Sequence, residues 1–178
     1  TPEWRAVNPK GRIPALAPVA GSAGGARELL TEVPAILLYL ALRHPEADLL
    51  PTEAAPIARA VEWMNWLSGN VHAMAYGQIW RTQRFSDDEA AVESIRARGR
   101  AALAEHHAYI ESLLADGRGW ALPAGYSVVD AYLLVFFHWG RRIGLNMRDY
   151  PAWAALTDRM LLRPAVQCVL ESEGVVIA

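Results

Sequence analysis

The start of a predicted helix at residues 32–43 holds two residues whose types and position suit a charged ligand. Glu32 and Val33 stand in its first turn, where main-chain amides lack a partner inside the helix and the positive end of the helix dipole favours a carboxylate. The Glu32 carboxylate can take up an ammonium group at the same place. The pair could hold both charges of a zwitterion, although an acid that only stabilises its own helix is the plainer interpretation of Glu32.

His72 and the dipeptide Ile13-Pro14 are two further candidates. An imidazole in a helical pattern, such as that of His72, either hydrogen-bonds a reactive group or is satisfied by a backbone or water partner, and the sequence favours neither interpretation. Ile13-Pro14 lies in a short segment whose prolines disfavour helix. Taken alone, Pro14 is most simply a turn proline with an ordinary trans bond.

Most other reactive side chains are predicted to be structural. Asp130 stands three residues after Ser127 and is best explained as a helix cap, while Cys168 between apolar neighbours is interpreted as a packing residue. Neighbouring His106 and His107 diverge by about 100° on a helix and are expected at the surface. Adjacency therefore gives them no shared metal, and we predict no metal site.

The remaining histidine and aromatic candidates are also assigned to packing. His138 is expected to be buried with its hydrogen bonds satisfied, because it lies in the most apolar stretch of the chain. Large side chains at helical spacing are interpreted as core rather than as the wall of an apolar pocket: Trp63, Met64, Trp66 and Tyr76.

Composition and charge limit the class of protein. The 178 residues are 53% hydrophobic and 20% charged, which is enough apolar surface to bury a core. A formal net charge of −2 provides no basic field for a nucleic-acid partner, and the basic stretch Arg96–Arg100 is interpreted as a solvated helix face. The single cysteine excludes an internal disulfide and fits the cytoplasm.

The longest apolar stretch and the first residue bear on location and completeness. Residues 128–143 are interrupted by charged side chains, whereas a membrane span needs about 20 mostly apolar residues. We therefore expect no membrane anchor. The chain opens with Thr1 rather than Met, so we expect that its start is missing.

The N-terminal part is predicted to form a hairpin. Residues 12–19 contain two prolines and favour an edge strand, residues 21–25 form a glycine-rich turn, and residues 26–30 return as a second strand.

A helix and a linker are predicted next. The helix runs from Glu32 to about Arg43, with Thr31 as N-cap and Pro34 in the first turn. Residues 45–51 hold two prolines and precede a change to long amphipathic helices, so they are predicted to join two domains.

The second part is predicted to be a bundle of about five helices. The first spans residues 52 to about 80, with bends expected at Gly69 and Gly77. Capping boxes at Ser86–Glu89 and Ser127–Asp130 open the next two, and the second of these should be the central core helix. Two shorter helices, each with a proline in its first turn, complete the bundle at residues 151–162 and 164–173.

Three stretches resemble, in order and spacing, those of the glutathione S-transferase family. The segments Asn8-Pro9-Lys10-Gly11-Arg12-Ile13-Pro14-Ala15-Leu16 and Leu30–Ala41 are similar to the second half of the family's glutathione-binding domain. Gly125–Asp130 looks like the capping motif of its helical domain. Arg163–Gln167 with Glu173-Gly174 is similar to the C-terminal end of bacterial members. The ordered set covers nearly the whole chain.

The resemblance implies an α+β fold in two parts. An incomplete thioredoxin-like α/β domain at residues 1–44 would be joined by the linker at 45–51 to an all-α domain at 52–178. The first strand, first helix and second strand of the thioredoxin-like domain would lie before Thr1. The family's thiol-activating Ser, Tyr or Cys lies in that segment, so no residue of this chain takes that role.

The resemblance also implies roles for the candidate residues. The Ile13–Pro14 bond would be cis, so that the Ile13 N–H and C=O pair with the cysteinyl part of glutathione. Glu32 would take the γ-glutamyl ammonium, and the Val33 amide could still donate, although many relatives carry a Ser hydroxyl that Val33 lacks. His72 stands where several bacterial members place a histidine facing the glutathione sulfur, and an imidazole there could assist a thiolate.

The leading hypothesis is a cytoplasmic, homodimeric glutathione S-transferase that conjugates glutathione, its co-substrate, to apolar electrophiles in detoxification. Neither a metal nor a nucleic-acid or membrane partner is expected. Because fold does not fix chemistry, a glutathione-dependent isomerase is an alternative. A noncatalytic glutathione-binding or assembly protein is another, and the absence of a Ser hydroxyl at Val33 strengthens it.

Overall fold

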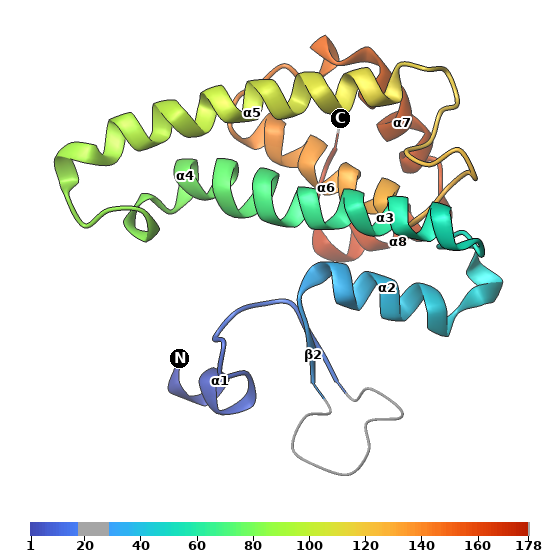
Figure 1. The fold of residues 1–178 in the computed structure, drawn as a ribbon, viewed down its shortest axis with the longest axis horizontal. Helices are drawn as coiled ribbons and strands as arrows, with labels where there is room; N and C mark the ends of the chain where they lie inside the picture. Colours follow the sequence, from blue (N-terminus) through green and yellow to red (C-terminus); the bar gives the residue numbers. More distant parts are fainter. Residues whose placement is uncertain (18–28, 178) are drawn as a thin grey trace.

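A small hairpin with one helix is followed by a bundle of long helices in the computed structural model, which describes residues 1–17 and 29–177. Figure 1 shows the two long helices of the bundle lying side by side, with α2 beneath them and the hairpin and α1 projecting beyond α2. None of the described helices is long and apolar enough to cross a membrane.

A short helix that the sequence analysis did not predict opens the chain. Helix α1 spans Pro2–Val7, with the Thr1 hydroxyl accepting a hydrogen bond from the Trp4 amide at 3.3 Å. The signal was present, since a threonine N-cap, a proline in the first turn and the acidic Glu3 are typical of a helix start.

The hairpin is shorter than predicted. Strands β1 (Ala15–Leu16) and β2 (Leu30–Thr31) pair antiparallel, with Ala15 opposite Thr31 and Leu16 opposite Leu30. The expected turn at residues 21–25, and most of the second strand expected at 26–30, lie outside the described residues.

Helix α2 spans Val33–Arg43, as predicted, but its N-cap is Glu32 and not Thr31. The prediction of Thr31 fails because that residue pairs with Ala15 in the sheet and its hydroxyl accepts a hydrogen bond from the Lys10 ammonium at 2.9 Å. A short turn η1 (Pro45–Ala47) then leads toward the bundle.

The first long helix runs on without a break where bends were expected at Gly69 and Gly77. It consists of α3 (Ala54–Trp66), a π-helical segment η2 (Leu67–Tyr76) and α4 (Gly77–Trp80). The backbone at both junctions stays right-handed helical. Gly69 lies within the π-helical segment, a geometry that is often found at functional sites.

The capping box predicted at Ser86–Glu89 is absent. The Ser86 hydroxyl accepts from the Asp88 amide at 3.0 Å, and the Asp88 carboxylate accepts from Ala90 at 2.9 Å. Asp88 thus caps a short turn η4 (Glu89–Ala91), and α5 (Val92–Leu114) begins only after it. The prediction was wrong because Asp88, and not Ser86, is the N-cap, so Glu89 is the first residue of the turn and not its third.

The predicted capping box at Ser127 is present and opens α6 (Val128–Arg142), the central helix. The Asp130 carboxylate is fully buried and accepts hydrogen bonds from the Ser127 amide and the Ala121 amide, each at 2.8 Å. The Val128 amide donates to the Leu49 carbonyl at 2.9 Å. These bonds tie the start of α6 to the loop before it and to the segment that joins the hairpin part to the bundle.

Two short helices complete the bundle at the predicted positions. Helix α7 spans Pro151–Leu161 and α8 spans Pro164–Glu173. The start of α7 is capped from α5, since the Glu111 carboxylate accepts from the Ala152 and Trp153 amides at 2.8 and 3.0 Å.

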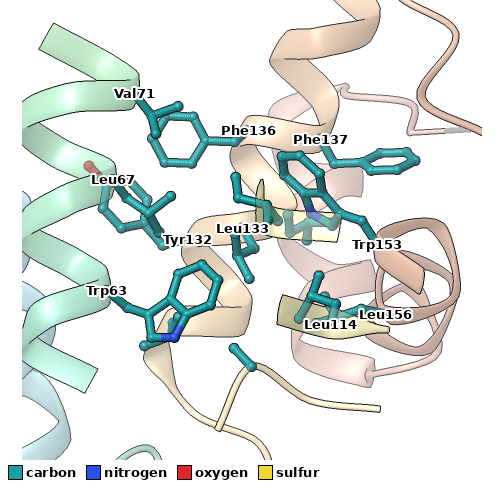
Figure 2. Packing of buried hydrophobic residues seen from close by; sticks show 14 of the residues in the cluster. Trp63, Leu67, Val71, Leu114, Tyr132, Leu133, Phe136, Phe137, Trp153 and Leu156 are labelled. Atoms are coloured by element: carbon teal, nitrogen blue, oxygen red, sulfur yellow. The ribbon is translucent and has the colours of Figure 1, made fainter. Parts of the chain in front are cut away.

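The core lies where the first long helix, α6 and α7 meet. Figure 2 shows Trp63, Leu67 and Val71 on one side facing aromatic side chains of α6. The interpretation of Trp63, Met64 and Tyr76 as core is confirmed, because the three are at most 7% exposed. Trp66 is half-buried at the edge of this core.

Three predictions about reactive residues were wrong. His107 is fully buried rather than at the surface, and packs edge-on against Trp153 with ring centroids 5.2 Å apart. His138 is only half-buried, and its Nδ1 has no hydrogen-bond partner among the described residues. Cys168 is exposed, because α8 packs on the bundle through other residues. Periodicity alone did not show which side of each helix faces the bundle.

Gly99 marks the closest approach of α5 to the first long helix. A Cβ at this position would lie 2.9 Å from the Ala75 carbonyl oxygen, whereas none at Gly69 would have a heavy atom within 4 Å. We predict that Gly99→Ala lowers the free energy of unfolding by about 1–3 kcal/mol through overpacking. Gly69→Ala should leave it unchanged or raise it by about 0.5–1 kcal/mol. Urea unfolding of both variants measures this, and equal effects would contradict it.

Burial lowers the pKa of His107 to about 4, with the charge of His106 adding to the effect. The unfolded chain therefore binds the proton first, so stability is complete above pH 6.5 and declines as the pH falls from 6.5 to 4. We predict a loss of up to about 3 kcal/mol over this window from His107. Urea unfolding between pH 6.5 and 4 should show a smaller loss of the free energy of unfolding for His107→Gln than for the wild type. The exposed His44 supplies the control, since His44→Gln should keep the full loss.

Candidate functional site

A groove runs between the start of α2 and the first long helix. It encloses about 450 Å³ and is lined by Glu32, Pro34, Ala35 and Leu38 on one side and by Val61, Met64, Asn65, Ser68 and Gly69 on the other. Its polar groups therefore come from one carboxylate, one amide and one hydroxyl. Glu32, predicted as a site residue, lies in this groove.

The backbone of Glu32 is held in an unusual conformation. Its φ is 73° and its ψ 122°, a region that costs a residue with a side chain about 1–3 kcal/mol. Its side chain makes no capping hydrogen bond to the first turn of α2. Such strain is often kept where it orients a functional group, and here it leaves the first-turn amide of Val33 without a cap from the described residues.

The hairpin brings the predicted residues to one end of the sheet. Because Ala15 pairs antiparallel with Thr31, Ile13-Pro14, which precedes Ala15, and Glu32-Val33, which follows Thr31, adjoin the same residue pair at one end of the hairpin. The Ile13–Pro14 bond is cis, as the family resemblance implied. The Ile13 side chain is 82% exposed and is not part of the groove.

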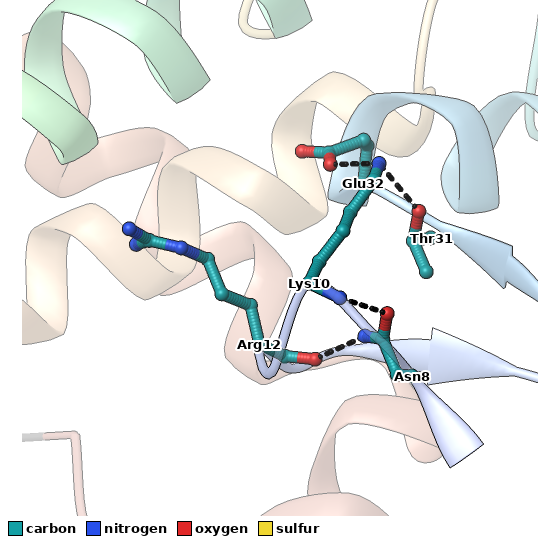
Figure 3. A network of polar contacts seen from close by, with 5 residues as sticks. All are labelled: Asn8, Lys10, Arg12, Thr31 and Glu32. Atoms are coloured by element: carbon teal, nitrogen blue, oxygen red, sulfur yellow. Dashed lines mark hydrogen bonds and ion pairs between the residues drawn. The ribbon is translucent and has the colours of Figure 1, made fainter. Parts of the chain in front are cut away.

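A polar network that the sequence analysis missed joins the two strands at this end. The Lys10 ammonium lies 2.7 Å from a Glu32 carboxylate oxygen and 2.9 Å from the Thr31 hydroxyl. Lys10 is held in turn by the buried Asn8 side chain, which accepts from the Lys10 amide at 3.1 Å and donates to the Arg12 carbonyl at 2.7 Å. Figure 3 shows the Arg12 guanidinium pointing away from this network.

His72 lies in the π-helical segment η2 and is half-buried. Its ring packs edge-on against Trp139 with centroids 4.8 Å apart. Burial lowers the pKa of His72, and the positive charges of Arg84, Arg81 and Arg12 lower it further. At neutral pH the imidazole is therefore uncharged, so it can either accept or donate a hydrogen bond.

The electrostatic contact with Arg12 relates His72 to the hairpin end, since Arg12 immediately precedes Ile13. Of the predicted site residues, Glu32 lines the groove, whereas Ile13, Pro14, Val33 and His72 do not. Within residues 1–17 and 29–177, no group of three or more His, Cys, Asp or Glu side chains is arranged to hold a metal ion.

Asn65 and Ser68 are groove residues that the sequence analysis did not single out. With His72 they occupy positions i, i+3 and i+7 of one helix and so share a face. Uncharged polar residues at this spacing, next to the apolar face of the helix, were a usable signal. It was overlooked because the apolar residues were used to define the helix.

Comparison with known proteins was made by family model, by sequence and by structure. No family model matches the chain. The chain is 32% identical over 173 residues to glutathione S-transferase GstA of Escherichia coli O157:H7, covering 97% of this chain and 79% of that protein. It is 27% identical over 165 residues to maleylacetoacetate isomerase of Pseudomonas aeruginosa, covering 92% of this chain and 73% of that one.

Solved structures agree with this relationship. A glutathione transferase homologue from Sulfitobacter, solved with bound glutathione, superposes with a TM-score of 0.85 at 28% identity, covering 99% of this chain and 80% of that chain. The beta-class glutathione S-transferase of Sphingomonas chungbukensis gives a TM-score of 0.79 at 29% identity, with 97% and 79% covered.

The chain belongs to the glutathione S-transferase family. The predicted fold class, a partial thioredoxin-like domain followed by a helical domain, is confirmed by these superpositions.

Proposed function

We propose that this protein is a glutathione S-transferase that binds glutathione at the Glu32 end of the hairpin and joins it through its sulfur to an electrophile held beside the helical bundle. The observation that carries the proposal is the shared end of the sheet, where Ile13-Pro14 precedes Ala15 and Glu32-Val33 follows its partner Thr31. Membership of the glutathione S-transferase family supports it, as does the similar fold of the Sulfitobacter homologue, which was solved with bound glutathione.

Glutathione recognition follows from the charges at this end. The Glu32 carboxylate takes the γ-glutamyl ammonium, and the Val33 amide at the start of α2 donates to the neighbouring carboxylate, where the helix dipole favours negative charge. The main chain of Ile13 pairs with the cysteinyl part. Before glutathione binds, the Lys10 ammonium, 2.7 Å from a Glu32 carboxylate oxygen, orients that carboxylate.

The chemical step is attack by the glutathione sulfur. The thiol gives up its proton, a new carbon–sulfur bond forms, and the bond to the leaving group breaks with its electron pair going to that group. Thiolate is the nucleophile. The neutral His72 imidazole is the assisting group we assign to this chain, hydrogen-bonding the sulfur, while the main thiol-activating residue is placed before Thr1 by family analogy.

The surroundings of the site suit an apolar electrophile. Trp139 packs against His72, and Trp80 packs on Trp139 with centroids 5.2 Å apart while remaining 42% exposed. By analogy with the family, we also propose the domain division at 1–44, 45–51 and 52–178, a homodimer, and a detoxifying role in the cytoplasm.

A second candidate is a glutathione-dependent isomerase. The relative named maleylacetoacetate isomerase supports it, since it aligns with 92% of this chain. A noncatalytic glutathione-binding protein is the third, favoured by the missing hydroxyl at Val33. Retention on immobilised glutathione without turnover of any electrophile would support that third version.

We predict that the complete protein conjugates glutathione to the aryl halide chlorodinitrobenzene and that Glu32→Gln raises its KM for glutathione. Loss of one charge-assisted hydrogen bond to the ammonium should raise KM by about tenfold, with a smaller effect on kcat. Steady-state kinetics with varied glutathione measures it. Glu173→Gln, at the exposed end of α8, is the matched control and should leave KM unchanged. An unaltered KM in Glu32→Gln would refute the assignment.

His72→Gln should lower kcat by about 10–100-fold with little change in KM for glutathione, because the lost group acts on the sulfur during reaction. Since burial and the arginines lower the pKa of His72, the wild-type rate should fall only below pH 6.5, and this acid limb should be missing in the variant. The pH profile of kcat tests this. His106→Gln on α5 is the control, and an equal drop there would argue for a merely structural effect.

A further inference from the structure

We propose that the electrophile carries a carboxylate or similar anionic group, which Arg81 and Arg84 bind next to the Trp80 and Trp139 rings. This inference rests on the proposed transferase function and names the class of its second substrate: an unsaturated or aromatic electrophile with an acidic group.

Arg81 and Arg84 occupy a tight turn at the end of the first long helix. Arg81 ends α4, and η3 (Thr82–Arg84) follows directly, closed by a hydrogen bond from the Arg84 amide to the Arg81 carbonyl at 2.9 Å. The turn folds back on the helix, where the Phe85 ring approaches Gly77. The two guanidinium groups are thereby placed on the same short segment, next to Trp80.

The positive charge here is not compensated within the described chain. None of the ion pairs among the described residues involves Arg81, Arg84 or Arg12, and none of their side chains makes a hydrogen bond there. The charges nevertheless act on one another. Burial and then the charges of Arg12 and Arg81 lower the pKa of Arg84, and burial together with all three arginines lowers the pKa of His72. Like charges this close repel, and a bound anion would relieve the repulsion.

Arginine is well suited to such an anion. Its planar guanidinium donates two parallel hydrogen bonds to a carboxylate, and these are stronger than bonds between neutral groups. Arg148 makes this arrangement elsewhere in the chain, with both carboxylate oxygens of Asp158 at 2.7 and 2.9 Å. Arg81 and Arg84 have no such partner among the described residues, and they differ from other unpaired arginines such as Arg98 in directly following Trp80, whose ring contacts Trp139.

Aromatic rings adjoin these charges. Trp80 is stacked on Tyr76 with centroids 4.8 Å apart and contacts Trp139 edge-on, and Trp139 contacts His72. An elongated ligand could therefore lie with a flat apolar body on Trp80 and Trp139, its acidic group on the arginines and its reactive carbon toward His72. This combination selects an acidic aromatic or conjugated electrophile over a purely apolar one.

A carboxylate of glutathione is the other anion that Arg81 and Arg84 could bind. Glutathione is proposed to lie at the hairpin end, against Glu32, whereas Arg81 and Arg84 extend from the far end of the α3–α4 helix beside the aromatic rings. This placement favours the electrophile as the source of the anion.

Two probes that differ by one carboxylate test the proposal. Chlorodinitrobenzene and chlorodinitrobenzoate react alike: the glutathione sulfur bonds to the carbon bearing chlorine, the carbon–chlorine bond breaks, and chloride leaves with the electron pair while the thiol proton goes to water. In the complete protein, the double variant Arg81→Gln/Arg84→Gln should lower kcat/KM for chlorodinitrobenzoate by about tenfold or more. For chlorodinitrobenzene it should change by less than about twofold.

Controls separate the other outcomes. Arg98→Gln, on the exposed face of α5, should leave both ratios unchanged. A rise in KM for glutathione with both probes would assign the arginines to glutathione and overturn the proposal, as would an equal fall in kcat/KM for both. Binding of unreactive dinitrobenzoate, followed by tryptophan fluorescence, is independent of turnover. If wild type binds it through these arginines but conjugates neither probe, the anion site stands and the proposed function fails.

Discussion

The buried carboxylate of Asp130 is the constraint on which the arrangement of the two parts depends. It accepts from the Ser127 and Ala121 amides and thereby fixes where the central helix α6 begins. Two residues before it, the Val128 amide donates to the Leu49 carbonyl in the joining segment, so the same turn sets the position of α2 against the bundle. Removing the carboxylate would leave two buried donors unpaired, each costing about 1–3 kcal/mol. The groove at Glu32 exists because these two parts are held together.

The helices of the bundle could be predicted from the sequence because apolar spacing and proline positions report directly on them. Helices α6, α7 and α8 begin within a residue of their predicted positions. The π-helical widening at Leu67–Tyr76 was not predicted, because the apolar spacing used to find the helix does not distinguish π from α geometry. Likewise the burial of His107 follows from its contacts with α7, which lies far along the chain.

The candidate site was predicted in part. Glu32 was found because a helix start is recognisable in sequence, and the cis bond at Ile13–Pro14 because the family resemblance implied it. Lys10 and the arginine pair at residues 81 and 84 were missed, since their significance lies in which charges they meet across the fold. Local sequence patterns do not show which charged side chains of distant segments come close together in the fold.

The cap of α7 has a consequence for the order of folding. Its first amides are satisfied by Glu111, which belongs to α5 and lies some forty residues earlier in the chain. A peptide containing α7 alone lacks that acceptor, and at 11 residues it is too short to be stable by itself. Helix α7 should therefore become ordered only when it docks on α5.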